Sequence, residues 1–253
     1  MCRLLGVVTP APIRLADSLA DLVEPFTGLS REHRDGWGIA AWRTDGELAV
    51  AKEVLAAHAS EAFPKALAET VTDAALLHIR MASPGLPTEP RNTHPFSAGA
   101  IAFAHNGWFT PVDAVDALIG PELLAAARGD TDSERYFLRV LARLRTEDPV
   151  DALARAAADI RAHAGFASLN CLLLTPQALY AYADEDPDSE VSRRRGPDFF
   201  RLRYQADAER AVVASSGIGP QPEQAGWSVL PYRQVLEIRR ADLRVSTHRV
   251  QTG

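Results

Sequence analysis

The chain has 253 residues, 47% of them hydrophobic, and a formal net charge of −6 at pH 7. This length and apolar content allow one large core, so a single domain spanning residues 1–253 is expected. The acidic balance gives no electrostatic footprint for nucleic acid or for an anionic membrane surface, which excludes both as expected partners.

The N-terminal apolar run, residues 4–8, is too short for a signal peptide. No segment approaches the roughly 18 uninterrupted apolar residues that a membrane span needs. We therefore expect a cytoplasmic protein without a membrane segment. The only cysteines, Cys2 and Cys171, lie far apart and lack CxxC spacing. This pattern does not indicate a disulfide framework or a thiolate metal site.

The first 110 residues are expected to form mostly strands. Helical spacing of apolar residues predicts one helix over residues 18–26. Short apolar or alternating runs between Gly, Pro and polar turn residues predict strands at 4–8, 37–42, 48–52, 76–80 and 100–104.

The second half of the chain changes from helices back to strands. Alanine-rich and leucine-rich segments with a period near 3.6 predict three or four helices over 112–164, broken at Pro121, Gly129 and Pro149. Apolar runs then predict strands at 169–175, 179–182, 199–204, 211–214, 234–239 and 243–250. This order favours an α+β fold in which stacked sheets are covered by helices. Residues 184–197 are expected to be an exposed loop, with a lid or a partner contact as the alternative.

Cys2 directly follows the initiator methionine. Its small side chain permits removal of Met1, which would leave a thiol and a free α-amine on one residue. An α-amine titrates near about 7.7–8.0 and a thiol near about 8.5, so the amine can accept the thiol proton at neutral pH. Cys2 is therefore a candidate nucleophile, and a semi-buried structural cysteine is the alternative.

Asn106 and Gly107 follow the apolar run 101–104, and the pattern predicts that Asn106 lies where a strand ends and the chain turns. An Asn amide and the next backbone N–H are suited to binding a developing oxyanion. The alternative is an ordinary turn that uses the tolerance of Asn-Gly for positive φ.

Two charged residues are candidates for binding the ends of an amino acid. Arg80 precedes a tight turn that contains Ser83, and the two together would hold a carboxylate; a surface ion pair is the alternative. Thr131 and Glu134 fit a capping box, which would leave Asp132 in the first helical turn free to accept an ammonium group.

Metal and cofactor sites are not indicated. His78, His94 and His105 show neither His-Glu-x-x-His spacing nor a nearby thiolate pair, and residues 215–220 lack the lysine of a phosphate loop. We expect no metal and no cofactor. Cys171, within an apolar run, is expected to be a packed core thiol.

Six motifs in this order resemble those of the class II glutamine amidotransferases. They are Cys2, Asp35-Gly36-Trp37-Gly38, His78-Ile79-Arg80, Asn92-Thr93-His94-Pro95-Phe96, His105-Asn106-Gly107 and Asp132-Ser133-Glu134. They cover about the first 140 residues, and the chain is most similar to free-standing members like the γ-glutamyl hydrolases of the ergothioneine pathway. The resemblance implies the N-terminal-nucleophile hydrolase fold, a four-layer αββα sandwich with two antiparallel sheets between helix layers.

The resemblance also implies the role of each site residue. Cys2 would attack, Asn106 and Gly107 would form the oxyanion hole, Arg80 with Ser83 would hold the α-carboxylate of a glutamine or γ-glutamyl substrate, Asp132 would bind its α-ammonium, and His94 would line the pocket. Two positions depart from the family, where an arginine is common at Glu32 and a bulky aromatic at Met81.

Three functions follow as expectations. The first is an amidohydrolase that forms a γ-glutamyl thioester and releases glutamate with an amine or ammonia. The second is a glutaminase subunit that supplies ammonia to a separate synthase, because no synthase domain is seen in this sequence. The third is a non-catalytic γ-glutamyl sensor or scaffold. The sequence does not indicate the oligomeric state.

Overall fold

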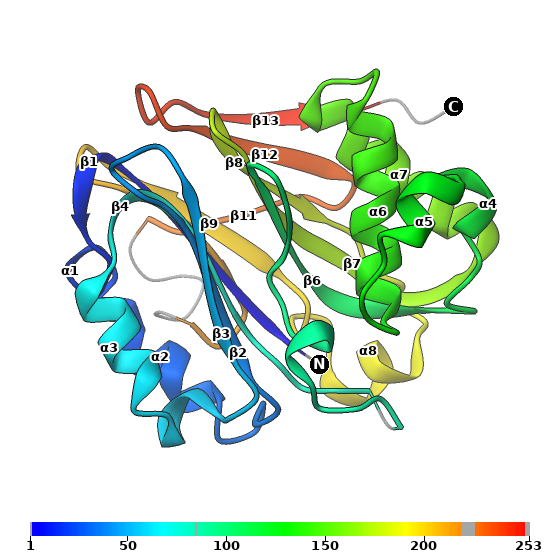
Figure 1. Cartoon of the computed structure of the whole chain (residues 1–253), viewed down its shortest axis with the longest axis horizontal. Coiled ribbons are helices and arrows are strands. Elements are labelled where there is room, and N and C mark those ends of the chain that lie inside the picture. The colour runs from blue at the N-terminus through cyan, green and yellow to red at the C-terminus, as the bar shows by residue number, and fades with distance from the viewer. Residues whose placement is uncertain (1, 84, 219–225, 251–253) are drawn as a thin grey trace.

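Two antiparallel sheets lie face to face, and helices cover the outer face of each (Figure 1). The computed structural model describes residues 2–83, 85–218 and 226–250. Met1, whose removal the sequence predicts, and Pro84 of the expected turn lie outside these residues. The layers confirm the predicted four-layer αββα sandwich of the N-terminal-nucleophile hydrolases.

The first sheet has seven strands in the order β11-β9-β10-β1-β4-β2-β3, and the second has six in the order β13-β12-β8-β7-β6-β5. The strands of the first sheet are β1 (Arg3–Arg14), β2 (Trp37–Trp42), β3 (Leu48–Glu53), β4 (Val71–Ile79), β9 (Leu202–Ala206), β10 (Ala211–Ser215) and β11 (Ser228–Val229). Those of the second are β5 (Phe96–Ala98), β6 (Ile101–Thr110), β7 (Gly165–Leu174), β8 (Ala178–Ala183), β12 (Gln234–Arg239) and β13 (Val245–Arg249).

The helices form two groups on opposite sides of the sheets, and a short one lies apart (Figure 1). The first group is α1 (Leu15–Ser18), α2 (Ala20–Leu29) and α3 (Ala62–Glu69), and the second is α4 (Asp116–Ile119), α5 (Pro121–Ala125), α6 (Asp132–Leu144) and α7 (Pro149–His163). α8 (Glu190–Arg195) and two 3-10 turns, Ala57–Ala59 and Pro90–Asn92, complete the set.

Side-chain alternation decides which strand residues face the space between the sheets. In β1, Leu4 and Val8 join a core that includes Leu172 of β7, whereas Leu5 and Val7 join a core with the helices α1–α3. Successive strand side chains point to opposite faces, so residues two apart share a face. The sheets approach closely at Gly6, where a Cβ would lie 2.6 Å from Cδ2 of Leu179.

The sequence predicts most elements, and four of its expectations are wrong in detail. The expected helix 18–26 is two helices, and the predictions omit α3, β5 and β11. Asn106 does not lie at a strand end, because β6 continues to Thr110. Residues 184–197 are not an exposed loop, since they begin with the buried acids Asp184 and Glu185 and contain α8. Arg161 and Tyr232 bond these acids, so burial does not leave them unpaired.

Candidate active site

Three of the predicted site residues occupy the facing sides of the two sheets. Cys2 precedes Leu4 by two residues, Arg80 follows Leu76 by four, and Asn106 follows Ala104 by two. Leu4, Leu76 and Ala104 all belong to the core between the sheets, so strand alternation points the three polar side chains into the same layer. Side-chain alternation therefore brings together residues that are distant in the sequence.

Cys2 lies beside the segment that follows β4. Register pairs Arg3 with Ile79, so Cys2 comes opposite Arg80. Cys2 is 7% exposed, and its Sγ lies 3.7 Å from the carbonyl oxygen of Met81. Burial raises the pKa of this thiol, and the positive charge of Arg80 acts in the opposite direction. A nucleophile here needs a nearby base, because burial alone favours the neutral thiol.

Arg80 is a buried cation and not a surface one, since only 3% of it is exposed. Its Nη2 donates to the carbonyl oxygen of Pro87 over 3.3 Å, and its Nη1 has no hydrogen-bond partner among the described residues. Burial lowers the pKa of Arg80, and the charges of Cys2 and Asp35 oppose this. A buried guanidinium with a free N–H is a strong site for a carboxylate.

Backbone contacts fix the turn beyond Arg80. The backbone N–H of Arg80 donates to Gly36 over 2.8 Å, and that of Asp35 donates to Arg80 over 3.0 Å. The Asp35 carboxylate accepts from the N–H of Ala82 over 2.8 Å. Ser83, by contrast, is exposed, and the structure does not bring its hydroxyl to a described partner.

Asn106 is fully buried, and neither its Nδ2 nor its Oδ1 has a hydrogen-bond partner among the described residues. An unsatisfied buried polar group costs about 1–3 kcal/mol. Such an amide is typical of a side chain whose partner is a ligand. Its position inside β6, directly paired with Asn170 of β7, holds it in one place.

Gly107 is required by the close approach of β7. A Cβ at this position would lie 1.7 Å from the carbonyl oxygen of Ser168, a distance that no side chain tolerates. The glycine therefore allows the two strands to pack closely. Its backbone N–H is the next one along the chain after Asn106. The sequence explained this glycine by an open oxyanion turn, whereas the structure shows a continuous, tightly paired strand.

Asp132 begins α6 with its carboxylate buried, 7% exposed. As predicted, the Thr131 hydroxyl caps the helix by accepting from the N–H of Glu134 over 3.1 Å. Asp132 is not entirely free, because its Oδ2 accepts from the N–H of Phe109 over 2.9 Å. Burial raises the pKa of Asp132.

His105 lies beside Asp132 and organises its surroundings. Its Nε2 lies 3.0 Å from the carbonyl oxygen of Ser168, so Nε2 carries the proton. In the neutral ring Nδ1 then accepts from the Ser133 hydroxyl over 2.9 Å. Burial lowers the pKa of His105, which favours this neutral form. The Ser133 hydroxyl also lies 3.5 Å from Oδ1 of Asp132. Its single proton is used in the shorter bond to His105, so Oδ1 can accept from a cationic partner.

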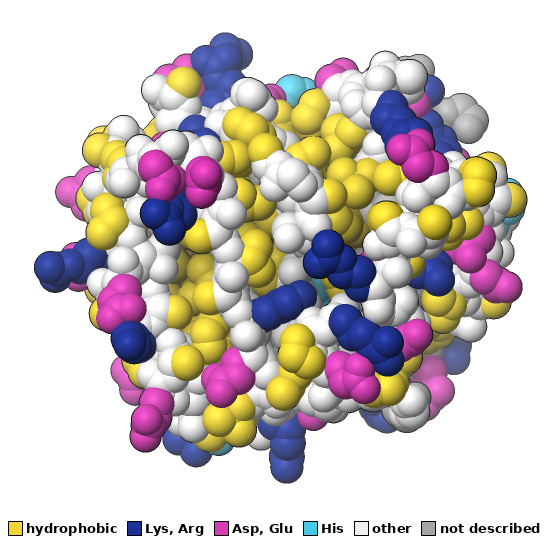
Figure 2. All heavy atoms as spheres, in the orientation of Figure 1, with side chains coloured by type: hydrophobic (Ala, Val, Ile, Leu, Met, Phe, Trp, Pro, Cys, Tyr) yellow, Lys and Arg dark blue, Asp and Glu magenta, His cyan; other side chains and the backbone are white. Residues whose placement is uncertain are grey.

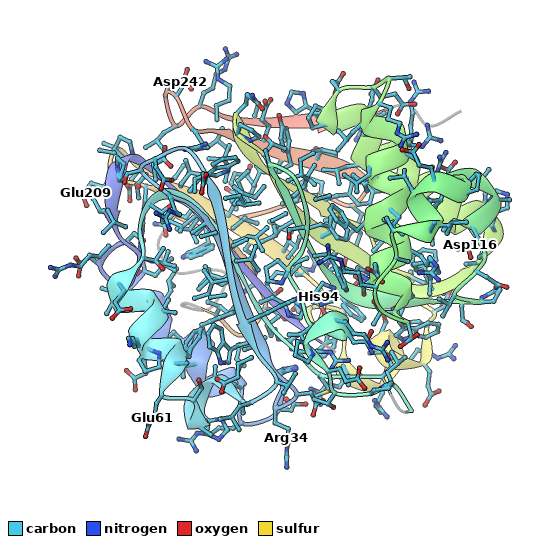
Figure 3. The ribbon with its side chains drawn as sticks, viewed as in Figure 1. Arg34, Glu61, His94, Asp116, Glu209 and Asp242 are labelled. Carbon is cyan, nitrogen blue, oxygen red and sulfur yellow. The ribbon has the colours of Figure 1, made fainter. Side chains whose placement is uncertain are left out.

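The ring of His94 lies 4.2 Å from that of His78, centroid to centroid, in a tilted arrangement, and meets the Phe96 ring edge-on at 4.6 Å. It is 4% exposed, and Figure 3 places it near the centre of the molecule. Burial holds the pKa of both histidines well below the usual range, so their rings are neutral. His94 thus presents a neutral ring, and neither of its nitrogens has a hydrogen-bond partner among the described residues.

Sequence reasoning missed a stack of side chains around Arg3. Its Nη1 donates to the carbonyl oxygen of Cys2 over 3.2 Å, and its guanidinium lies 4.4 Å from the ring centroid of Phe199. Arg195 of α8 lies over the same ring at 4.6 Å and pairs with Glu32. Burial lowers the pKa of Arg3 to about 10. A cation next to a candidate thiolate is a sequence signal that points to Arg3.

The described residues contain no group of three or more His, Cys, Asp or Glu side chains placed to hold a metal ion. Within the same residues, no helix is long and apolar enough to cross a membrane. Cys171 is fully buried beside Tyr136, which confirms it as a core thiol.

The family model described as "Glutamine amidotransferases class-II" matches residues 1–223. The chain belongs to the class II glutamine amidotransferases. It is 27% identical over 97% of its length to the Gamma-glutamyl-hercynylcysteine sulfoxide hydrolase of Mycolicibacterium smegmatis, and covers 99% of that protein. Its match to a probable glutamine amidotransferase of Saccharomyces cerevisiae, DUG3, is 27% identical over 54% of this chain and 44% of the other.

Two solved structures share the fold. A glutamine aminotransferase class-II domain protein from Silicibacter pomeroyi superposes with a TM-score of 0.68 at 22% identity, over 98% of this chain and 99% of that one. The glutamine PRPP amidotransferase of B. subtilis gives 0.63 at 16% identity, over 100% of this chain and 50% of that one.

This class II glutamine amidotransferase is thus an enzyme of the amidohydrolase type. Its departures from the family motifs have structural counterparts. Glu32 pairs with Arg195, and Met81 offers its backbone carbonyl, not its side chain, to the Cys2 thiol.

Proposed function

We propose that the enzyme hydrolyses the γ-amide of glutamine or of a γ-glutamyl amine through a thioester on Cys2. The main support for this is the amide of Asn106, which is fully buried and has no hydrogen-bond partner among the described residues. Asn106 belongs to the second sheet and faces the first sheet, which carries Cys2 and Arg80. The name of the M. smegmatis relative supports including γ-glutamyl conjugates beside glutamine.

The glutamyl half of the substrate is bound by charge at both ends. The Nη1 of Arg80, which has no hydrogen-bond partner among the described residues, holds the α-carboxylate. Oδ1 of Asp132, which lies 3.5 Å from the Ser133 hydroxyl, receives the α-ammonium. Ser83 reaches the carboxylate only if its exposed turn closes. His94 and His78 form the neutral wall behind the aliphatic part.

The reaction conserves every atom of substrate and water. The α-amine of Cys2 takes the thiol proton, and the thiolate attacks the γ-carbonyl carbon. The Asn106 amide and the Gly107 N–H stabilise the oxyanion, and the amine delivers the proton to the leaving nitrogen. Water then attacks the thioester, releasing glutamate and restoring the thiol. The charge of Arg3 favours the thiolate.

A substrate panel tests this proposal. Glutamine and a series of γ-glutamyl amides are incubated with purified enzyme from which Met1 has been removed, and glutamate, ammonia and free amine are quantified. The proposal expects stoichiometric glutamate from at least one compound. No glutamate from any member would contradict it. Turnover of glutamine that rises only with a co-purified synthase would instead identify an ammonia-supplying subunit.

Asp132→Asn is expected to raise KM about 10- to 100-fold with a smaller change in kcat, since one charge-assisted contact of about 1.5–3 kcal/mol is lost. The same change should raise Tm at pH 7. Burial raises the pKa of Asp132 in the folded state, so the charged carboxylate opposes folding. The stability that the protonated carboxyl confers is present at low pH and is lost as pH rises through this folded-state pKa.

The control for this prediction is Asp130→Asn, at an exposed carboxylate in the loop just before α6, 3.5 Å from Arg91. It should leave KM and Tm near the original values. Steady-state kinetics and thermal melts at several pH values give both quantities. An Asp132→Asn enzyme with unchanged KM would remove Asp132 from the binding site.

A further inference from the structure

A pocket of about 660 Å³ opens beside the candidate active site between β5 and α6, with Lys52 of β3 at its edge. None of its lining residues is Cys2, Arg80, Asn106 or Asp132. Figure 2 shows Lys and Arg side chains gathered near the centre of this face, with hydrophobic side chains among them. Its volume falls within the roughly 300–1,000 Å³ that is usual for small-molecule sites.

Three cations line the pocket, and two of them have no carboxylate in an ion pair among the described residues. Arg91 pairs with Glu89 at 2.6 Å and with Asp130 at 3.5 Å, so its charge is offset. Among the described residues, Lys52 donates hydrogen bonds to backbone carbonyls and lies 5.9 Å from the ring centroid of Phe96, and Arg128 is exposed. Burial lowers the pKa of Lys52; the charge of Glu134 opposes this, and the charge of Arg128 adds to it.

The one carboxylate in the lining is already bonded. Glu134 accepts from the N–H of Arg128 over 2.9 Å and from that of Gly129 over 2.7 Å. It holds the loop before α6 and does not form an ion pair with Lys52 or Arg128. The pocket therefore offers two cationic side chains whose hydrogen-bonding capacity is not taken up by acidic side chains.

The inner surface of the pocket is apolar. Phe96, Phe137 and Leu138 line it and are each 5% exposed or less. Apolar walls with a small number of placed charges are typical of sites for small organic ligands. Cations at the rim select an anionic group, and the aromatic rings select an apolar body.

Two residues of the pocket lining, Lys52 and Glu134, connect it to the candidate active site. The Lys52 ammonium donates to the carbonyl oxygens of Thr93 over 2.8 Å and Pro95 over 3.4 Å, on either side of His94. Glu134 lies in the same helical turn as Asp132. A ligand that draws Lys52 toward itself weakens its hold on the backbone around His94.

We propose that this pocket binds a small organic anion with an apolar body, and that Lys52 couples its occupation to the active site. The inference goes beyond the proposed amidohydrolase reaction. Binding of the anion does not depend on that reaction, whereas the coupling to the active site does. By linkage, the ligand and the γ-glutamyl substrate change each other's affinity by the same factor.

The probe for this test is 3-phenylpropionate, compared with its neutral amide by isothermal titration calorimetry on the whole enzyme. The acid should bind saturably, and the amide at least about tenfold more weakly, because it cannot make charge-assisted bonds. Arg128→Gln should weaken the binding of the acid by a similar factor. Arg43→Gln, an exposed arginine paired with Asp45 in the β2–β3 turn, is the matched control and should not.

Coupling is measured as the KM for a hydrolysed γ-glutamyl amide with and without saturating 3-phenylpropionate, with an expected change of about fivefold or more. No saturable binding, equal binding of acid and amide, or equal effects of the two arginine variants overturns the site. Binding with unchanged KM overturns the coupling. Failure of the amidohydrolase reaction itself leaves the calorimetric result intact.

Discussion

Cys2→Ala is expected to abolish the release of glutamate from γ-glutamyl substrates, lowering kcat by about 10⁴-fold or more. No other cysteine substitutes for it, because Cys171 is fully buried among core side chains and burial raises the pKa of its thiol to about 12. Without the Cys2 sulfur, the oxyanion donors and the carboxylate site remain, but no thioester forms.

Cys171→Ala is the matched control for this result. It removes the only other thiol and should keep kcat while costing a small amount of stability through the lost packing. Intact-mass measurement of the enzyme treated with a glutamine-like electrophile should show one adduct on Cys2. A Cys2→Ala enzyme that still hydrolyses γ-glutamyl amides at the original rate would refute the mechanism.

The state of Met1 belongs to the same experiment. While Met1 remains, the nitrogen of Cys2 is an amide and has no basic lone pair. Enzyme whose measured mass retains Met1 should therefore be inactive, and removal of the methionine should restore turnover. Full activity with Met1 in place would exclude the α-amine as the base.

The sequence predicts the fold well because strand and helix periodicity is local information. The strand 37–42 and the strand 234–239 match β2 and β12 to the residue. What it misses depends on tertiary contacts. β6 extends through Asn106 and Gly107 because β7 pairs with it, and an Asn-Gly pair read alone looks like a turn.

The candidate site was only partly accessible from the sequence. Motif order nominated Cys2, Arg80 and Asp132, but single-residue chemistry could not show that Arg80 is buried or that Phe109 occupies one oxygen of Asp132. The stack of Arg3 and Arg195 on Phe199 joins residues nearly 200 positions apart, and no spacing rule predicts such a contact.

Gly107→Ala is expected to combine a stability defect with a catalytic one. Its Cβ would lie 1.7 Å from the carbonyl oxygen of Ser168 and 2.7 Å from Nε2 of His105, so β7 must move away from β6. Disruption of a buried strand pair of this kind costs about 3 kcal/mol or more. The displaced N–H and Asn106 amide would also no longer meet the oxyanion, lowering kcat about 10²- to 10³-fold.

Gly165→Ala separates this steric argument from any general effect of replacing glycine in the same strand pair. Gly165 begins β7 opposite Thr110, and its Cβ would meet only the Thr110 carbonyl oxygen at 4.0 Å. Urea denaturation should place Gly165→Ala near the original protein and Gly107→Ala well below it. Equal stability of the two variants would mean that β7 yields freely at Ser168. A folded Gly107→Ala enzyme with normal kcat would show that this part of β6 does not stabilise the oxyanion.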